Sequence, residues 1–70
     1  MAYIHSEGPY PEFNFLQGTE TPIWYLSKCT DDGEMIVDYG KYYSLADCIA
    51  QADVLAAKAG IAHVCEAGRA

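Results

Sequence analysis

Five side chains in this sequence have the chemistry to bind a metal ion or to act as nucleophile and base: His5, Cys29, Cys48, His63 and Cys65. Structural zinc sites normally contain pairs of ligands two to four residues apart. The closest pair here is His63 and Cys65, which lie two residues apart and would point to the same side of a strand. That spacing permits a metal or thiol site but is typical of neither. We therefore expect no metal or other cofactor, and a small metal or thiol protein centred on this pair is the third alternative.

A catalytic cysteine needs a histidine base within hydrogen-bond reach and a third group that orients the histidine. Residues two apart on a strand share a side without making that hydrogen bond. A domain of 70 residues also offers little concavity from which water can be excluded. The sequence has no glycine-rich phosphate loop, no nucleophile elbow and no paired-histidine metalloprotease motif. These observations favour a binding protein, and we predict that it is not an enzyme.

The charge balance is acidic, with ten Asp and Glu residues against four Lys and Arg residues and a net charge of −6. Such a chain repels the phosphate backbone, so we predict no direct contact with nucleic acid. No apolar run approaches the ~20 residues needed to cross a bilayer. The first residues resemble no signal peptide, and three cysteines without close pairs favour free thiols in a reducing compartment. The expectation is a cytoplasmic protein that does not contact membranes.

The clearest structural signal is an amphipathic helix at about 44–59. Ser44 is a good N-cap, and Gly60 suits the left-handed position that ends a helix. Between them, apolar residues recur at steps of three and four, which builds one buried stripe. The stripe consists of Leu45, Cys48, Ile49, Ala52, Leu55, Ala56 and Ala59. Because several of these side chains are small, the pattern favours close packing on a flat sheet.

Strand patterns precede and follow this helix. Residues 23–29 and 34–39 are rich in strand-forming side chains, and the turn sequence 30–33 between them contains Asp-Gly, so we predict an antiparallel hairpin. Residues 61–66 form a third predicted strand, and residues 67–70 are expected to be a frayed end. Residues 22–66 thus read as a β-β-α-β unit. We predict one small domain, residues 1–70, of the α+β class, with the helix on one face of a small antiparallel sheet.

Residues 1–18 form an aromatic-rich N-terminal arm in this interpretation. Gly8, Pro9 and Pro11 interrupt a regular element, but the aromatic content argues against disorder. Two placements remain open. The arm adds an N-terminal strand to the sheet, or its aromatic side chains fold as a lid over the face that the helix does not cover.

A single helix covers one face of a small sheet, so the other face is available for binding. We expect Trp24, Leu26, Met35, Val37 and Tyr39 under the helix, and Ile23, Tyr25 and Ile36 on the other face. Acidic side chains gather on the hairpin beside these aromatic residues. Because such a surface is complementary to a basic one, we predict a protein-binding site there. Its predicted residues are Asp31, Asp32, Glu34 and Asp38, with Tyr25 and Tyr42 as apolar anchors.

The order of motifs, from Trp24 through Asp32-Gly33 and residues 43–49 to Gly60 and residues 61–64, resembles short β-β-α-β families of uncharacterised bacterial and phage proteins. In size and charge the chain is similar to small phage-encoded inhibitors of host defence, including anti-CRISPR proteins. This resemblance implies an inhibitor in the host cytoplasm that occupies a basic, nucleic-acid-binding surface of a partner protein. The main alternative is a structural homodimer that pairs through uncovered sheet faces or edge strands.

Overall fold

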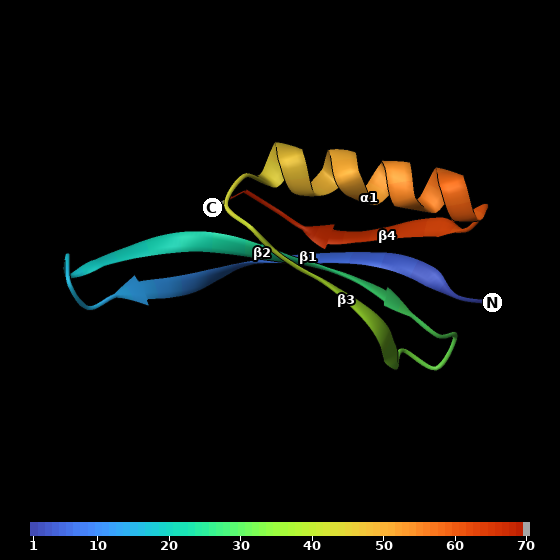
Figure 1. Ribbon diagram of the computed structural model, residues 1–70, viewed down its shortest axis with the longest axis horizontal. Coiled ribbons are helices and arrows are strands. Elements are labelled where there is room, and N and C mark those ends of the chain that lie inside the picture. Colours follow the sequence, from blue (N-terminus) through green and yellow to red (C-terminus); the bar gives the residue numbers. More distant parts are fainter. Residues whose placement is uncertain (70) are drawn as a thin grey trace.

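A computed structural model describes residues 1–69 of the chain. It contains β1 (Tyr3–Asn14), β2 (Thr19–Cys29), β3 (Met35–Tyr42), α1 (Leu45–Ala59) and β4 (Ala62–Ala67). The strands form one sheet in the order β3-β2-β1-β4, and α1 lies across one of its faces (Figure 1). The predicted α+β fold, with one helix on one face of a small sheet, is confirmed.

The sheet is mixed, so the prediction of a wholly antiparallel sheet is wrong. β2 is antiparallel to both β1 and β3, but β4 runs parallel to β1, with Tyr3 opposite Ala62 and Gly8 opposite Ala67. Two antiparallel steps make β3 parallel to β1. α1 then returns the chain to the end of the sheet at which β3 began, as helical crossovers between parallel strands do. The next strand, β4, therefore runs in the same direction as β3. A strand placed next to β1 after this crossover is therefore parallel to it.

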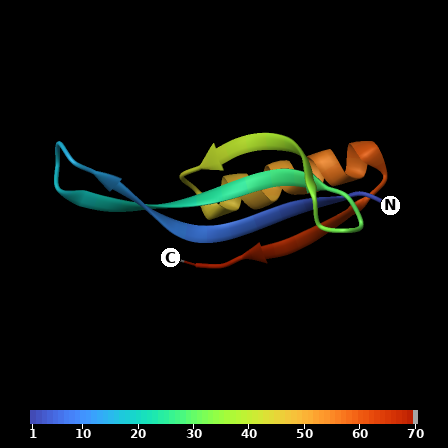
Figure 2. The same cartoon turned by 90° about the horizontal axis from the view of Figure 1, so that it is seen from below.

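Residues 1–18 are neither a separate arm nor a lid. β1 lies inside the sheet between β2 and β4 (Figure 2), which confirms the alternative of an added N-terminal strand. The register between β1 and β2 shifts between residues 7 and 10, so a bulge accommodates Gly8 and Pro9 within a paired strand. Phe13 and Phe15 are 47% and 88% exposed, and they do not cover the second face of the sheet.

The helix begins and ends where its signals predict. Ser44 has an extended backbone, and its hydroxyl oxygen accepts a hydrogen bond of 3.3 Å from the Asp47 N–H. Gly60 ends the helix in the left-handed conformation, with φ 65°. The buried side of α1 consists of Cys48, Ala52 and Ala56. Because these side chains are small, the helix backbone lies close to the sheet, as the sequence predicts.

The hydrophobic core lies between α1 and the two central strands. Ile4 of β1 and Trp24 and Leu26 of β2 are buried there against the small residues of the helix. The indole Nε1 of Trp24 donates a hydrogen bond of 2.9 Å to the Gly68 carbonyl, and the Gly68 N–H donates one of 3.0 Å to the Gly8 carbonyl. Ala67 is thus part of β4, and Gly68 is fixed by two hydrogen bonds, so a frayed end is wrong for these two residues. Residue 70 of that prediction lies outside the described residues.

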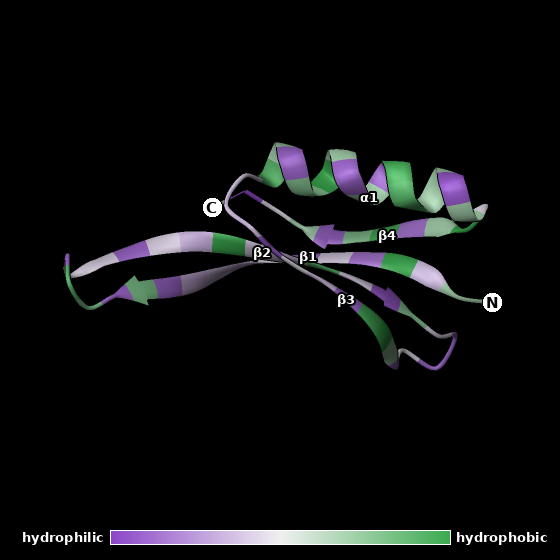
Figure 3. Cartoon of the chain, viewed as in Figure 1, coloured by the Kyte–Doolittle hydropathy of each residue, from purple (hydrophilic) through white to green (hydrophobic). Residues whose placement is uncertain are grey.

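The placement of β3 differs from the prediction. Met35, Val37 and Tyr39 were expected under the helix, but they are 57%, 39% and 36% exposed. Two register shifts against β2 break the simple alternation of side chains along β3, and α1 packs mainly over β1, β4 and β2. The apolar start of β3 consequently lies at the end of the strand that points away from α1 (Figure 3). Trp24 and Leu26 are under the helix, as predicted.

Candidate functional site

The face of the sheet opposite α1, called here the open face, is uncovered. Its residues follow from the strand register, because directly paired residues point to the same side of a sheet. They are Tyr3, His5, Glu7, Tyr25, Ser27, Cys29, Met35, Asp38, Lys41, Ala62, Val64 and Glu66. This set contains three carboxylates and one cation, Lys41, which forms an ion pair with Glu12. The face therefore combines net negative charge with aromatic and apolar area.

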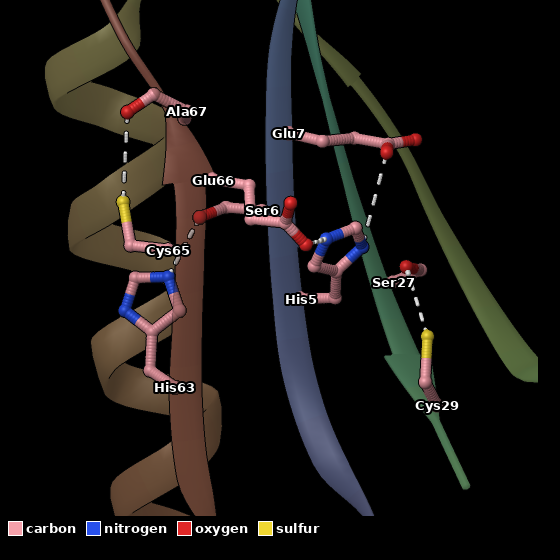
Figure 4. Close-up of polar contacts among 9 residues, drawn as sticks. All are labelled: His5, Ser6, Glu7, Ser27, Cys29, His63, Cys65, Glu66 and Ala67. Carbon is pink, nitrogen blue, oxygen red and sulfur yellow. Dashed lines mark hydrogen bonds and ion pairs between the residues drawn. The ribbon is translucent and has the colours of Figure 1, made fainter. Parts of the chain in front are cut away.

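His5 lies at the centre of the polar contacts on the open face. Its Nε2 is 2.8 Å from Glu66 Oε1, and its Nδ1 is 4.0 Å from Glu7 Oε2 (Figure 4). The ring of Tyr3 meets the imidazole edge-on, with 6.2 Å between the ring centroids. The negative charge of Glu7 also raises the pKa of the Tyr10 hydroxyl. His5, Glu7 and Glu66 were not among the predicted protein-binding residues, because the sequence left the placement of residues 1–18 open and does not specify that β1 pairs with β4.

A hollow lies on the open face between β1, β2 and β3. It is lined by Glu7, Tyr25, Leu26, Ser27, Met35 and Asp38. Two of these side chains are carboxylates, and Tyr25 is 39% exposed beside them. Tyr10 supports the ring of Tyr25 from the neighbouring strand, with 5.6 Å between the ring centroids. Negative charge and an accessible aromatic ring therefore occur together in one concave place.

The predicted acidic residues do not all lie at this hollow. Asp38 lines it, and one of its carboxylate oxygens accepts a hydrogen bond of 2.8 Å from the Gly40 N–H. Asp31, Asp32 and Glu34 are exposed in the turn between β2 and β3, where Asp31 forms an ion pair with the amino group of Met1. The turn acids thus stand at one end of the sheet, and Asp38 is the member of the predicted cluster that lines the hollow.

The two predicted aromatic anchors lie on opposite faces. Tyr25 points to the open face, whereas Tyr42 pairs with Trp24 and packs against the core under α1. Because the residues adjacent along β2 alternate between faces, Tyr25 and Trp24 cannot share a side. The structure therefore brings Tyr25 together with Asp38 and separates both from Tyr42.

A chain of hydrogen bonds joins a serine, a histidine and an aspartate on the helix side of the sheet. The Ser6 hydroxyl is 2.7 Å from His63 Nε2, and His63 Nδ1 is 2.8 Å from Asp53 Oδ1 of α1. Ser6 is completely buried, so its oxygen is out of reach of a substrate at the surface. The arrangement instead satisfies a buried hydroxyl and ties β1, β4 and α1 together.

The contacts of His63 and Cys65 concern the alternative of a metal or thiol site at these two residues. Both ring nitrogens of His63 are in hydrogen bonds, and the thiol of Cys65 lies 3.7 Å from the Ala67 carbonyl. Across residues 1–69, no group of three or more His, Cys, Asp and Glu side chains is arranged to hold a metal ion. Nothing in this geometry favours a site at His63 and Cys65.

The three cysteines should react very differently with a thiol reagent. Cys29 and Cys48 are buried, and burial is the main cause that raises the pKa of the Cys48 thiol, whereas Cys65 is exposed. Because the thiolate is the reactive form, we expect one thiol per native chain to react quickly with DTNB and the other two about 100-fold more slowly. Fast reaction of all three thiols in the folded protein would contradict the packing described. Cys65→Ser should abolish the fast phase.

The ion pair between Glu12 of β1 and Lys41 of β3 predicts how stability changes in acid. Glu12 accepts hydrogen bonds from Lys41 and from the Tyr43 hydroxyl, and these contacts hold its pKa below the ordinary value of 4.5. The unfolded chain therefore takes up this proton first as the pH falls. The stabilising contribution is present above pH 4.5 and is lost as the pH drops through the lowered pKa.

Urea unfolding of Glu12→Gln should accordingly show a smaller loss of stability between about pH 5 and about pH 3 than the wild type shows. Glu20→Gln is the matched control, since it removes one carboxylate from the neighbouring strand and leaves the Glu12–Lys41 pair in place. Identical pH profiles for Glu12→Gln and the wild type would show that this ion pair is broken in solution.

Comparison with protein families, curated proteins and solved structures gives no match for this chain. In the part of the chain that the structure describes, no helix has the length and apolar character needed to span a membrane. The geometry of the open face is therefore the basis for a functional proposal.

Proposed function

We propose that this chain is a non-enzymatic module that binds a partner protein with a basic surface through its open face. The observation that carries the proposal is the hollow in which Glu7 and Asp38 lie with Tyr25. A guanidinium group is planar and positively charged, forms hydrogen bonds with carboxylates and stacks on aromatic rings. An arginine side chain of the partner is therefore the occupant that fits this hollow best.

The charge around the hollow supports the same proposal. Glu66 adds a third carboxylate to the open face, and the whole chain carries a net charge of −6. A field of this sign speeds the approach of a basic surface and slows that of nucleic acid. The turn acids Asp31, Asp32 and Glu34 would extend the contact at the rim of the sheet.

The finer proposal is an inhibitor of the kind that phages encode against host defence. Basic surfaces on proteins commonly bind phosphate backbones. A small acidic module seated on such a surface excludes nucleic acid by occupying the same arginines. The expected place of action is the host cytoplasm. This version predicts that partner-bound nucleic acid and this chain compete.

A homodimer formed through the open face is the competing proposal. It would bury Glu7, Asp38 and Glu66 of both copies in one interface, and like charges at an interface are unfavourable. Pairing through β3 meets a different obstacle, because its two register shifts interrupt the regular ladder that an added strand needs. The charge of the open face and the bulged β3 edge thus rank the homodimer second.

The proposal can be tested without knowing the partner by measuring binding of a fluorescent oligoarginine peptide. The double variant Glu7→Gln/Asp38→Asn should weaken binding about fivefold or more relative to the wild type. Glu20→Gln/Asp47→Asn is the matched control, since it removes the same charge away from the hollow. Asp32→Asn/Glu34→Gln measures the contribution of the turn.

Equal weakening by the first two double variants would overturn the assignment, because only net charge would then attract the peptide. Amide shifts in an NMR titration should be largest at Tyr25 and Ser27, which line the hollow. Sedimentation at micromolar concentration decides the competing proposal. A stable dimer whose formation protects Tyr25 from solvent would favour the homodimer.

A further inference from the structure

The hairpin formed by the second half of β1 and the first half of β2 extends beyond the helix-covered body. The pairs run from Tyr10 opposite Ile23 to Asn14 opposite Thr19, and this ribbon reaches well past the end of α1 (Figures 1 and 2). Residues 15–18 close it. The ribbon has no sheet neighbour on either side over most of its length, so its shape is that of a finger.

The end of this finger carries large apolar side chains in solvent. Phe15 and Leu16 are 88% and 98% exposed, and Phe13 is 47% exposed. Phe13 and Phe15 meet edge-on, with 4.8 Å between the ring centroids. We call Phe13, Phe15 and Leu16 the apolar tip. Scattered apolar residues on a surface are ordinary, but three gathered at the end of a projecting hairpin form a candidate contact.

The turn that presents the apolar tip is well ordered. The side-chain oxygen of Asn14 accepts hydrogen bonds from the N–H groups of Leu16 and Gln17, at 3.0 and 3.3 Å. The Gly18 N–H donates to the Asn14 carbonyl at 2.8 Å, and Gly18 has φ 65°, which glycine adopts without strain. Since these bonds hold the turn, the backbone of the tip loses little conformational freedom when it binds.

The edges of the finger are poorly suited to accepting another strand. Pro11 and Pro22 lie opposite each other in the ribbon, and proline has no N–H to donate to a neighbouring strand. Addition of a peptide strand along the ribbon is thus disfavoured. The apolar tip remains as the binding element of the finger.

The negative charge of the finger indicates which kind of partner the apolar tip can bind. The ribbon carries Glu12, which is ion-paired with Lys41, and Glu20, so its charge is negative on balance, and the sequence contains no Lys or Arg before Lys28. Anionic lipid surfaces attract basic segments and repel acidic ones, so a membrane is disfavoured. A second copy of this acidic chain is disfavoured for the same reason. A partner protein whose apolar pocket has a basic rim suits both the tip and the glutamates beside it.

We propose that the apolar tip inserts into an apolar pocket with a basic rim on the same partner protein that the open face binds. This inference rests on the proposed function for the identity of the partner as a basic protein. The finger then supplies apolar contact area at a distance from the hollow. Burial of Phe15 and Leu16 would each account for roughly tenfold to hundredfold in affinity.

Site-specific photo-crosslinking tests this inference. A photoreactive phenylalanine analogue replaces Leu16 in one preparation and Ala50, on the exposed side of α1, in the control. After irradiation in extract of the native host cells, the Leu16 position should give an adduct whose cross-linked peptide lies in an apolar pocket of one protein, and the Ala50 position should not. The purified partner should then bind Phe15→Ala and Leu16→Ala roughly tenfold or more weakly, with an unchanged salt dependence.

Several results would overturn the inference. They are no adduct at Leu16, an adduct with a second copy of this chain, equal adducts at both positions, or unchanged affinity of the alanine variants. Flotation with vesicles of phosphatidylcholine, or of phosphatidylcholine with phosphatidylglycerol, that is lost in Phe15→Ala would assign the tip to lipid instead. The tip variants should leave oligoarginine binding unchanged, so failure of the tip and failure of the open face are measured separately.

Discussion

Replacing Gly8 by alanine is expected to destabilise the protein by about 3 kcal/mol, because the new side chain meets both backbone strain and a filled space. Gly8 has φ 130°, a conformation that other residues rarely adopt. A Cβ atom at this position would lie 2.8 Å from Cδ1 of Trp24 and 2.9 Å from the Ile23 carbonyl oxygen. Neither neighbour can withdraw easily, since one is a buried ring and the other is backbone. Urea denaturation monitored by tryptophan fluorescence measures the loss.

Gly68→Ala is the matched control for this substitution. Gly68 does not have a positive φ, and an added Cβ would meet nothing within 4 Å. Its N–H and carbonyl, which bond to Gly8 and Trp24, are kept in the variant. We expect a change within about 0.5 kcal/mol for this variant. If both glycine variants lose the same stability, the close approach at Gly8 is not the cause.

Truncation of Leu26 to alanine is expected to cost about 3–4 kcal/mol, which is most of the stability of so small a domain. Leu26 is fully buried on a central strand, between Ile4 on β1 and the small residues of α1. The helix backbone already lies close to the sheet there, so the structure has little room to collapse into the space. Thermal and urea unfolding should both show the loss.

Leu16→Ala makes the same chemical change at a side chain that is 98% exposed. This variant should unfold at nearly the same urea concentration as the wild type. A similar loss of stability in both variants would contradict the burial described for Leu26. The same control shows whether a later loss of partner binding by Leu16→Ala arises from a folding defect.

The helix and the β2–β3 hairpin could be predicted from the sequence because their signals are local. Ser44 and Gly60 mark the two ends of α1, and the Asp32-Gly33 pair marks the turn. The position of β1 could not be read in this way. Gly8 and Pro9 interrupt its pattern, and only the contact with β2 shows that a bulge absorbs them.

The site was predictable only in part for the same reason. Tyr25 and Asp38 belong to the hairpin, so their place on the open face follows from local pairing. Glu7 and Glu66 come from β1 and β4, which meet through a parallel pairing that no local pattern specifies. The short strand-like run Tyr3-Ile4-His5 was the available signal. The bulges in β3 likewise depend on pairing, which is why Met35 was placed on the wrong side.

The parallel pairing of β1 with β4 also constrains how the chain acquires its structure. Tyr3 lies opposite Ala62. One edge of β1 therefore stays unpaired until β4 is available to pair with it. Contacts between such distant parts of a chain form slowly, because a long loop must close first. During synthesis on the ribosome, β1 therefore has one bare edge until residues 62–67 emerge. During that interval the unpaired edge of β1 is accessible to chaperones and to wrong strand partners.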